Sequence, residues 1–233
     1  MTPPVRLAWL FDIDGTLLLT GGAAREAFVR AAREVFGLDD GLEDIGFAGR
    51  IDPEILREIL EKHELTPPPE SIERFYDNVV AHMDTAIHNG RGRLLPGVPA
   101  MLDAVAAESA WARTLLTGNM TRMAAIKLKH FGIAHHFAMG AYGEQAESRP
   151  ELARLAVARI RERYGVEPTR CVVVGDTIHD IACARAAGAL VVAVATGSQS
   201  RAELEAHAPD LALDDLTQRE ELLEWARGVE AGA

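Results

Sequence analysis

Two aspartates follow the first apolar run of the sequence. The stretch FDIDGTLL carries Asp12 and Asp14 directly after the apolar residues 7–11. In a strand, side chains two positions apart point to the same face, so the two carboxylates would lie side by side. Such a pair repels unless a cation or a shared proton is present. Carboxylates near a phosphate suit Mg²⁺, so the motif predicts metal-assisted chemistry on a phosphorylated compound.

The same stretch also fits a β-hairpin, because Asp-Gly between apolar runs is a strong turn signal. The residues 7–11 are apolar on both faces, however, which favours a central parallel strand over a half-solvated hairpin. The carboxyl ends of such strands are where open α/β sheets bind ligands.

A second pair of acids follows another apolar run, in VVVGDTIHD. Asp176 comes directly after Gly175, and Asp180 follows four residues later. Asp176 could also be the N-cap of the next helix, with Asp180 in solvent. Two strands that both end in acids favour a shared metal site instead.

The stretch LLTGN offers donors for a phosphate. Thr117 has a hydroxyl, and Gly118 and Asn119 have backbone N–H groups where a helix is expected to begin, which is a natural anion site. An ordinary strand-to-helix turn, with Thr117 or Asn119 as the cap, is the alternative.

A phosphate site also needs a local cation here, because the chain has a formal net charge of −11. We favour Arg149, which directly precedes Pro150 at the expected start of a helix. A solvated arginine at this place is the alternative. Lys127 and Lys129 lie on the helix after Thr117, and Lys129 is expected to lie too far along it.

The elements that position these residues follow from the apolar pattern. Short apolar runs alternate with helical patterns, which predicts βαβ units and a parallel sheet, and thus an α/β fold. The strands are expected at residues 7–11, 112–116, 171–174, 190–194 and 211–213. Helices are expected at residues 101–107, 121–131 and 150–164.

The region of residues 20–93 contains no convincing strand. It shows helical patterns over residues 24–35 and 71–88, and a third pattern that we expect to begin with Asp52 as the N-cap and Pro53 at the first helical position. We therefore predict an inserted helical domain at residues 20–93. The α/β core domain would comprise residues 1–19 and 94–233.

Composition restricts the possible partners and compartment. The negative net charge argues against nonspecific binding to nucleic acid or an anionic membrane. Cys171 and Cys183 predict neither a disulfide framework nor a zinc site. The start of the sequence has no secretory pattern, and no apolar run has the roughly 20 residues that a membrane helix needs. We expect a cytoplasmic protein that is a monomer or a homodimer.

Four stretches in this order, FDIDGTL, LLTGN, SRP and GDTIHD, resemble the motifs of the haloacid dehalogenase superfamily of phosphohydrolases. The long gap after the first motif is where that family inserts a helical cap. The LLPGV and AGRIDPEIL stretches are similar to its phosphoglycolate-phosphatase and β-phosphoglucomutase branch. The resemblance implies a Rossmann-like core with a central parallel sheet and an inserted α-helical cap.

The resemblance also implies roles for the site residues. Asp12 would attack phosphorus to form an aspartyl-phosphate, and Asp14 would protonate the leaving oxygen and then deprotonate water. Mg²⁺ would be held by Asp12, Asp14 (through its backbone carbonyl) and Asp176, with Asp180 as a further ligand or a support. The residues expected to bind the phosphoryl group or the substrate are Gly15, Thr16, Arg50, Thr117, Gly118 and Asn119.

One departure from the family is Arg149, which stands where a lysine is usual. Arginine makes up 21 of the 24 basic residues. A general replacement of lysine by arginine in this chain is therefore one explanation of the exchange. A planar guanidinium and a point-charge ammonium are not equivalent at a phosphate.

Three functions fit this sequence. The first is an enzyme, a phosphoric monoester hydrolase that uses Mg²⁺ on a small phosphorylated metabolite such as phosphoglycolate or a sugar phosphate. The second is a phosphomutase, which would need more cations in the cap than Arg50. The third is a noncatalytic metabolite-binding protein on the same fold.

Overall fold

Strand β1 (Leu7–Phe11) lies in the middle of the sheet that organises the molecule. The computed structural model describes residues 4–232. Its main sheet has six strands in the order β5-β4-β1-β6-β7-β8, and every adjacent pair is parallel. The other five strands are β4 (Trp111–Leu116), β5 (Gly140–Ala141), β6 (Cys171–Gly175), β7 (Leu190–Val194) and β8 (Leu211–Leu213). The predicted α/β fold with a central parallel sheet is confirmed.

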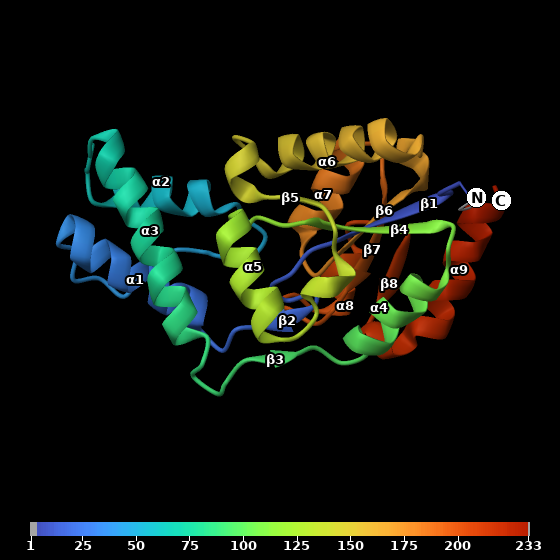
Figure 1. The fold of residues 1–233 in the computed structure, drawn as a ribbon, viewed down its shortest axis with the longest axis horizontal. Coiled ribbons are helices and arrows are strands. Elements are labelled where there is room, and N and C mark those ends of the chain that lie inside the picture. Colours follow the sequence, from blue (N-terminus) through green and yellow to red (C-terminus); the bar gives the residue numbers. More distant parts are fainter. Residues whose placement is uncertain (1–3, 233) are drawn as a thin grey trace.

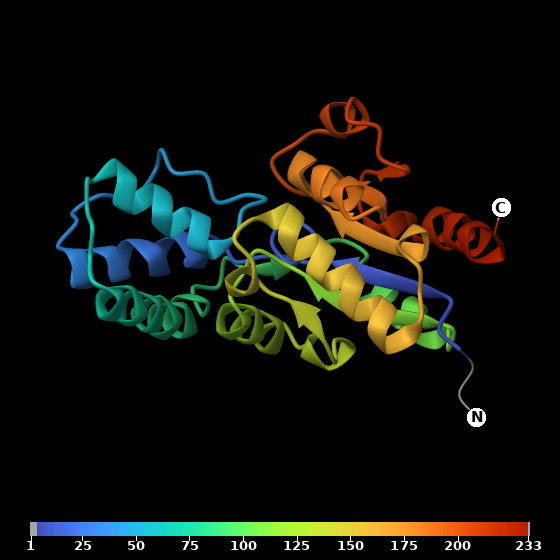
Figure 2. The same ribbon diagram turned by 90° about the horizontal axis from the view of Figure 1, so that it is seen from above.

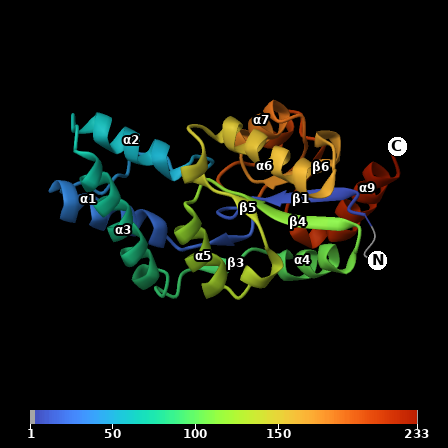
Figure 3. The same cartoon turned by 45° about the horizontal axis from the view of Figure 1, so that its top comes forward.

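Helices cover both faces of this sheet, as Figure 3 shows with α6 and α7 above it and α4 and α5 below it. Residues Leu7, Trp9 and Phe11 of β1 are buried in one apolar cluster, and Ala8 and Leu10 are buried in the cluster on the opposite face. This alternation is what a strand with two covered faces requires. The helices are α4 (Val98–Ala107), α5 (Thr121–His130), α6 (Arg149–Tyr164), α7 (Ile178–Ala186), α8 (Arg201–Glu205) and α9 (Arg219–Ala231).

A second group of helices extends from one end of the sheet (Figures 1 and 2). It consists of α1 (Ala23–Phe36), α2 (Asp52–Lys62) and α3 (Pro69–Ala86), which lie in the chain between the short strands β2 (Leu18–Leu19) and β3 (Arg93–Leu94). We call these three helices and their connections the helical insertion. They share an apolar cluster of their own, which also takes in Met120 and Met123 near the start of α5.

The two crossings between the sheet and the insertion run side by side. Strands β2 and β3 pair antiparallel, and the Asn89 amide donates to the backbone oxygens of Thr20 and Gly21 at 3.3 Å each. The first motif is therefore not a hairpin, because β1 pairs with β4 and β6 while Leu18 and Leu19 pair with β3.

The start of α2 differs from the prediction. Asp52 is the first helical residue, and Ile51 occupies the N-cap position. Asp52 does not cap its own helix, because its carboxylate accepts a hydrogen bond from the backbone N–H of Met120, which precedes α5. A neighbouring helix thus competes successfully for a side chain whose local sequence predicts a local cap.

Other element boundaries shift by a few residues. The helix predicted at residues 71–88 is α3, which begins earlier, at Pro69, because a proline is well tolerated in the first helical turn. The two-residue strands β2, β3 and β5 carry too few residues to give a pattern. None of the helices in residues 4–232 is both long and apolar enough to cross a membrane.

The insertion's apolar cluster predicts a cost for one substitution. Phe75 of α3 is fully buried, and its ring packs against Phe28, Phe36 and Tyr76. Phe75→Ala should lower the free energy of unfolding by about 3–5 kcal/mol, because the cavity it leaves is enclosed by other rings. Urea denaturation measures this difference. A loss under about 1 kcal/mol would show that this cluster contributes little to stability.

Candidate active site

The carboxyl ends of β1, β4 and β6 meet at one edge of the sheet. Phe11 pairs with Leu115 of β4 and with Val174 of β6, so the residues that follow each strand lie together. These residues are Asp12, Thr117 and Asp176, all buried. The site therefore lies beside the central strand, where the chain order of the sheet changes direction.

Three carboxylates gather at this edge. One oxygen each of Asp12, Asp176 and Asp180 lies within 4.8 Å of the others. Burial raises the pKa of Asp12 to about 6, with the Arg149 charge opposing the shift and the neighbouring carboxylates adding to it. Burial and the charges of Asp180 and Asp12 raise the pKa of Asp176 to about 8. The cluster therefore carries more negative charge than its surroundings stabilise.

Arg149 is the buried cation of this cluster. Its Nη2 donates to Asp180 Oδ1 and lies 3.3 Å from Asp12 Oδ1, so one guanidinium bridges two of the three acids. The Nε–H of Arg149 is buried without a hydrogen-bond partner among the described residues. An unpartnered buried donor on the arginine that contacts Asp12 fits a site that takes up an anion. The predicted placement of Arg149 at the site agrees with this geometry.

Asp180 is held by the protein on both of its oxygens. Oδ1 accepts from Arg149, while Oδ2 accepts from the backbone N–H of Thr177 at 3.0 Å and from its hydroxyl at 2.7 Å. Gly175 lies so close that a Cβ there would overlap the Asp180 carboxylate. This arrangement favours the supporting role for Asp180 over direct metal ligation.

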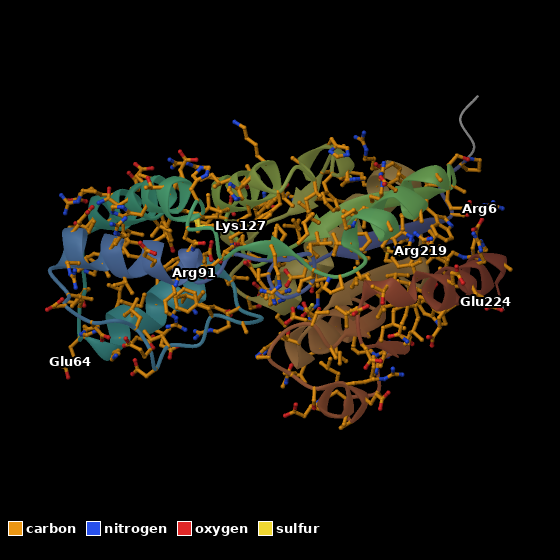
Figure 4. The ribbon with its side chains drawn as sticks, turned by 90° about the horizontal axis from the view of Figure 1, so that it is seen from below. Arg6, Glu64, Arg91, Lys127, Arg219 and Glu224 are labelled. Carbon is orange, nitrogen blue, oxygen red and sulfur yellow. The ribbon has the colours of Figure 1, made fainter. Side chains whose placement is uncertain are left out.

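Asp14 faces a different cation from Asp12. The Nζ of Lys127 lies 2.6 Å from Asp14 Oδ2 and 2.5 Å from Asn119 Oδ1, and the Asn119 amide donates to the same Asp14 oxygen at 2.7 Å. Lys127 is 1% exposed, and Figure 4 shows it near the junction between the insertion and the sheet. Arg149 and Lys127 thus each serve one of the two aspartates of the first motif.

More of the donors in the loop after β4 already form hydrogen bonds within the protein than the sequence predicts. The Thr117 hydroxyl accepts from the Asn119 side-chain amide at 2.7 Å and from the Asn119 backbone N–H, one of the predicted phosphate donors, at 3.3 Å. The next two N–H groups are already taken: Met120 donates to Asp52, and Thr121 donates to Glu144. A Cβ at Gly118 would overlap the backbone oxygen of Arg50. Gly118 therefore allows a close approach of the insertion as well as offering an N–H group.

The first motif also positions Asp176. The Thr16 hydroxyl donates to Asp176 Oδ1 at 3.2 Å. Gly15 has φ +82°, and a Cβ there would overlap the Asp176 carboxylate, as would a Cβ at Gly197 after β7. The Thr196 hydroxyl donates to the backbone oxygen of Gly15 at 2.5 Å. The loop after β7 completes the site, and only its Thr-Gly pair at a strand end could have indicated this.

A cavity of about 350 Å³ connects the site to the insertion. Its wall includes Asp12, Asp14 and Lys127 on the sheet side and the apolar residues Phe28 and Phe47 on the insertion side. Such a volume fits a small metabolite.

Two arginines of the insertion also line the cavity. The Arg50 guanidinium donates to the Glu58 carboxylate and to two backbone oxygens, so its charge is offset by an acid. The Arg25 guanidinium donates to the backbone oxygens of Leu42 and Ile45 and lies 4.5 Å from the centre of the Phe47 ring. Arg25 forms no ion pair with an acid among the described residues.

Comparison with known proteins agrees with this geometry. Residues 8–188 match the model of the haloacid dehalogenase-like hydrolase family. The chain belongs to this family. The match includes β1 from its second residue, the helical insertion, β4 and β6, and therefore every acid and cation described above.

Relatives of similar length carry different names. A phosphoglycolate phosphatase of Agrobacterium fabrum is 26% identical over 88% of this chain and 87% of its own. A 5'-nucleotidase of Pseudomonas aeruginosa is 26% identical over 92% and 94%. The crystal structure of a predicted phosphoglycolate phosphatase from Haemophilus somnus has a TM-score of 0.71 and 21% identity, covering 96% of this chain and 100% of that one. The predicted enzyme class, a phosphoric monoester hydrolase, is confirmed.

The bridging position of Arg149 predicts the effect of a conservative change. Arg149→Lys should lower kcat/KM for a phosphate monoester about 10- to 100-fold. The shorter lysine side chain does not reach the Nη2 position between Asp12 and Asp180, and it lacks the buried Nε–H donor. Arg154→Lys on the exposed face of the same helix is the matched control. Steady-state kinetics on both variants measures the difference. Equal activity of Arg149→Lys and wild type would show that only the charge matters.

Proposed function

We propose that the protein hydrolyses a small phosphorylated metabolite with Mg²⁺, through an aspartyl-phosphate on Asp12. The observation that carries the proposal is the division of charge at the site. Asp12 shares a buried cluster with Asp176, Asp180 and Arg149, while Asp14 is held apart by Lys127 and Asn119. Two carboxylates in different surroundings can perform two different roles.

The acids fit a divalent metal ion. Asp12 and Asp176 have raised pKa values, and the protein's own cation contacts Asp12 and Asp180 but leaves Asp176 with the Thr16 hydroxyl as its donor. Oxygen ligands of this kind are those that Mg²⁺ prefers. Asp12, Asp176 and the backbone carbonyl of Asp14 would hold the ion, and Asp180 would keep the cluster in place. The bound ion would neutralise charge on the phosphoryl oxygens.

The residues divide the reaction into two steps. Asp12 attacks phosphorus and the bond between phosphorus and the leaving oxygen breaks. The leaving oxygen keeps the electron pair of that bond and takes a proton from Asp14. Water then attacks the phosphorus of the aspartyl-phosphate, gives its proton to Asp14 and restores Asp12. Arg149 and the Thr117 loop hold the phosphoryl oxygens. Lys127 and Asn119 keep Asp14 oriented as an acceptor, which suits the second step.

The cavity supports a small substrate. Its sheet side supplies the reacting groups, and the insertion closes it with Phe28, Phe47 and Arg25. We infer that residues 20–93 act as the cap domain that excludes water, with Thr20, Gly21 and Gly22 as part of its hinge. A phosphoglycolate-like compound or a sugar phosphate fits this volume. The relatives are named for different substrates, so their names do not choose between these classes.

The phosphomutase alternative has less support. A mutase must hold a second phosphate in the cap. Arg50, the residue predicted for this role, is already paired with Glu58, and the other insertion arginine of the cavity, Arg25, already donates to two backbone oxygens. Hydrolysis therefore accounts better for the charges of the cavity.

Turnover with two kinds of leaving group tests the proposed roles. Asp12→Asn should lower kcat about 10³-fold or more on every substrate, because it removes the nucleophile. Asp14→Asn should lower kcat about 10²- to 10⁴-fold on alkyl phosphates, because their leaving oxygen needs a proton. The first-turnover release of p-nitrophenolate should persist in Asp14→Asn, since that anion leaves without a proton. An equal loss of the first-turnover rate on both substrates would remove Asp14 as the acid.

Metal binding should depend on pH. The raised pKa values of about 6 for Asp12 and about 8 for Asp176 mean that protons leave these groups when a metal binds. Mg²⁺ affinity should therefore rise as the pH increases from 6 to 8 and level off above that. Titration calorimetry at several pH values measures this, with Asp176→Asn abolishing binding and the exposed Asp84→Asn retaining it. A pH-independent affinity, or one retained in Asp176→Asn, would place the metal elsewhere.

A further inference from the structure

Asp52 is a buried acid that the proposed chemistry does not use. It lies at the start of α2 in the helical insertion, is 6% exposed and lines the cavity. Within the described residues it has no cation within 4.0 Å, and burial raises its pKa to about 7 against the opposing charge of Lys127. Asp14 and Glu144 add to this shift. A buried carboxylate without a paired cation is costly, so its position calls for a physical reason.

The reason lies in what Asp52 contacts across the junction. Its carboxylate accepts from the Met120 N–H at 2.8 Å, and its own N–H donates to the Gly118 backbone oxygen at 2.8 Å. Both partners belong to the loop that links β4 to α5 and carries Thr117 and Asn119. One residue of the insertion therefore makes two hydrogen bonds to the loop that would hold the phosphoryl group.

Glycines allow the backbones to approach this closely. A Cβ at Gly118 would overlap the Arg50 backbone oxygen, and a Cβ at Gly143 would overlap the Gly118 backbone oxygen. Three backbone segments thus meet at one place: the loop after β4, residues 50–52 of the insertion, and the segment at Gly143. On the other side of the site, Gly49 leaves room for Thr177 and His179. The segment 49–52 consequently contacts both the loop after β4 and Thr177 and His179 after β6.

The N-terminal end of α5 favours the arrangement in which the insertion lies against the loop after β4. The N-terminal end of a helix carries unpaired N–H groups and partial positive charge. Here the Met120 N–H donates to the Asp52 carboxylate, and the Thr121 N–H donates to the Glu144 carboxylate. Glu144 comes from the core, but Asp52 comes from the insertion. Moving the insertion away would leave the Met120 N–H without its acceptor.

We propose that Asp52 is a positioning residue that latches the insertion onto the phosphate-binding loop, so that phosphate occupancy and closure of the cavity favour each other. The inference rests on the proposed phosphatase function, since it assumes that the Thr117–Asn119 loop holds the phosphoryl group. Asp52 itself does not touch the reacting atoms. It acts through the Gly118 oxygen and the Met120 N–H, and its loss opens the cavity without removing a catalytic group.

Hydrogen exchange with inorganic phosphate and Mg²⁺ as the probe tests the latch. In the wild type, phosphate should slow amide exchange both in the loop at residues 117–121 and in the insertion at residues 49–56. In Asp52→Ala, exchange of the Met120 amide should be about 5-fold faster without phosphate, and phosphate should still protect the loop but not residues 49–56. Asp52→Asn, which keeps an acceptor oxygen, should restore part of the protection. Glu61→Gln, an exposed acid on the same helix, should behave as the wild type.

The outcomes separate the two proposals. Protection of residues 49–56 in Asp52→Ala equal to that in the wild type would overturn the latch. Equal changes in Glu61→Gln would also overturn it, because the effect would then be a general loss of charge on α2. If phosphate fails to protect residues 117–121 even in the wild type, the proposed phosphate site itself is wrong.

Kinetics supply a second readout that a purely structural role would not move. Asp52→Ala should raise KM for an alkyl phosphate about 10-fold or more while kcat for p-nitrophenyl phosphate, an activated ester, changes less than about 3-fold. The KM of the conservative variant Asp52→Asn should lie between those of the wild type and Asp52→Ala. Equal losses of kcat on both esters would assign Asp52 to the chemistry instead of the latch.

Discussion

Mutual repulsion among buried carboxylates is the constraint on which the rest of this structure depends. Asp12, Asp176 and Asp180 converge within 4.8 Å at the edge of the sheet, and the protein supplies one buried guanidinium to them. Burial and like charge raise the pKa values of Asp12 and Asp176, which shows that the protein alone does not balance the charge. A divalent cation would supply the missing positive charge, which the negatively charged phosphoryl group of a substrate also requires.

The same edge of the sheet explains why so many glycines lie around the site. Gly15, Gly175 and Gly197 each leave room for a carboxylate, and Gly118 leaves room for the insertion. The acids can crowd together only because neighbouring backbones carry no side chains there. The insertion then covers the site through a segment that contacts the loops after both β4 and β6. Catalytic geometry and closure of the cavity thus depend on one set of close backbone contacts.

Much of this arrangement could be predicted from the sequence because strands with two covered faces leave long apolar runs. Leu7–Phe11 and Leu190–Val194 are strands at the predicted residues, and the acids after β1 and β6 meet as expected. Arg149 was also predicted at the site. Contacts across the junction could not be predicted, because local sequence does not say which helix a side chain will serve. Asp52 has the sequence pattern of a cap for α2 and instead accepts a hydrogen bond next to α5. Lys127, weighed only as an alternative to Arg149, lies at the site together with it.

Trapping the covalent intermediate tests the central claim most directly. Wild-type protein is mixed with Mg²⁺ and an alkyl phosphate, quenched in acid within one turnover and digested, and the peptide that contains Asp12 is analysed by mass spectrometry. The account predicts that this peptide gains the mass of one phosphoryl group, and that the gain is absent in Asp12→Asn. Turnover in the wild type without phosphoryl transfer to any residue would mean that water attacks the substrate directly, and would contradict the account.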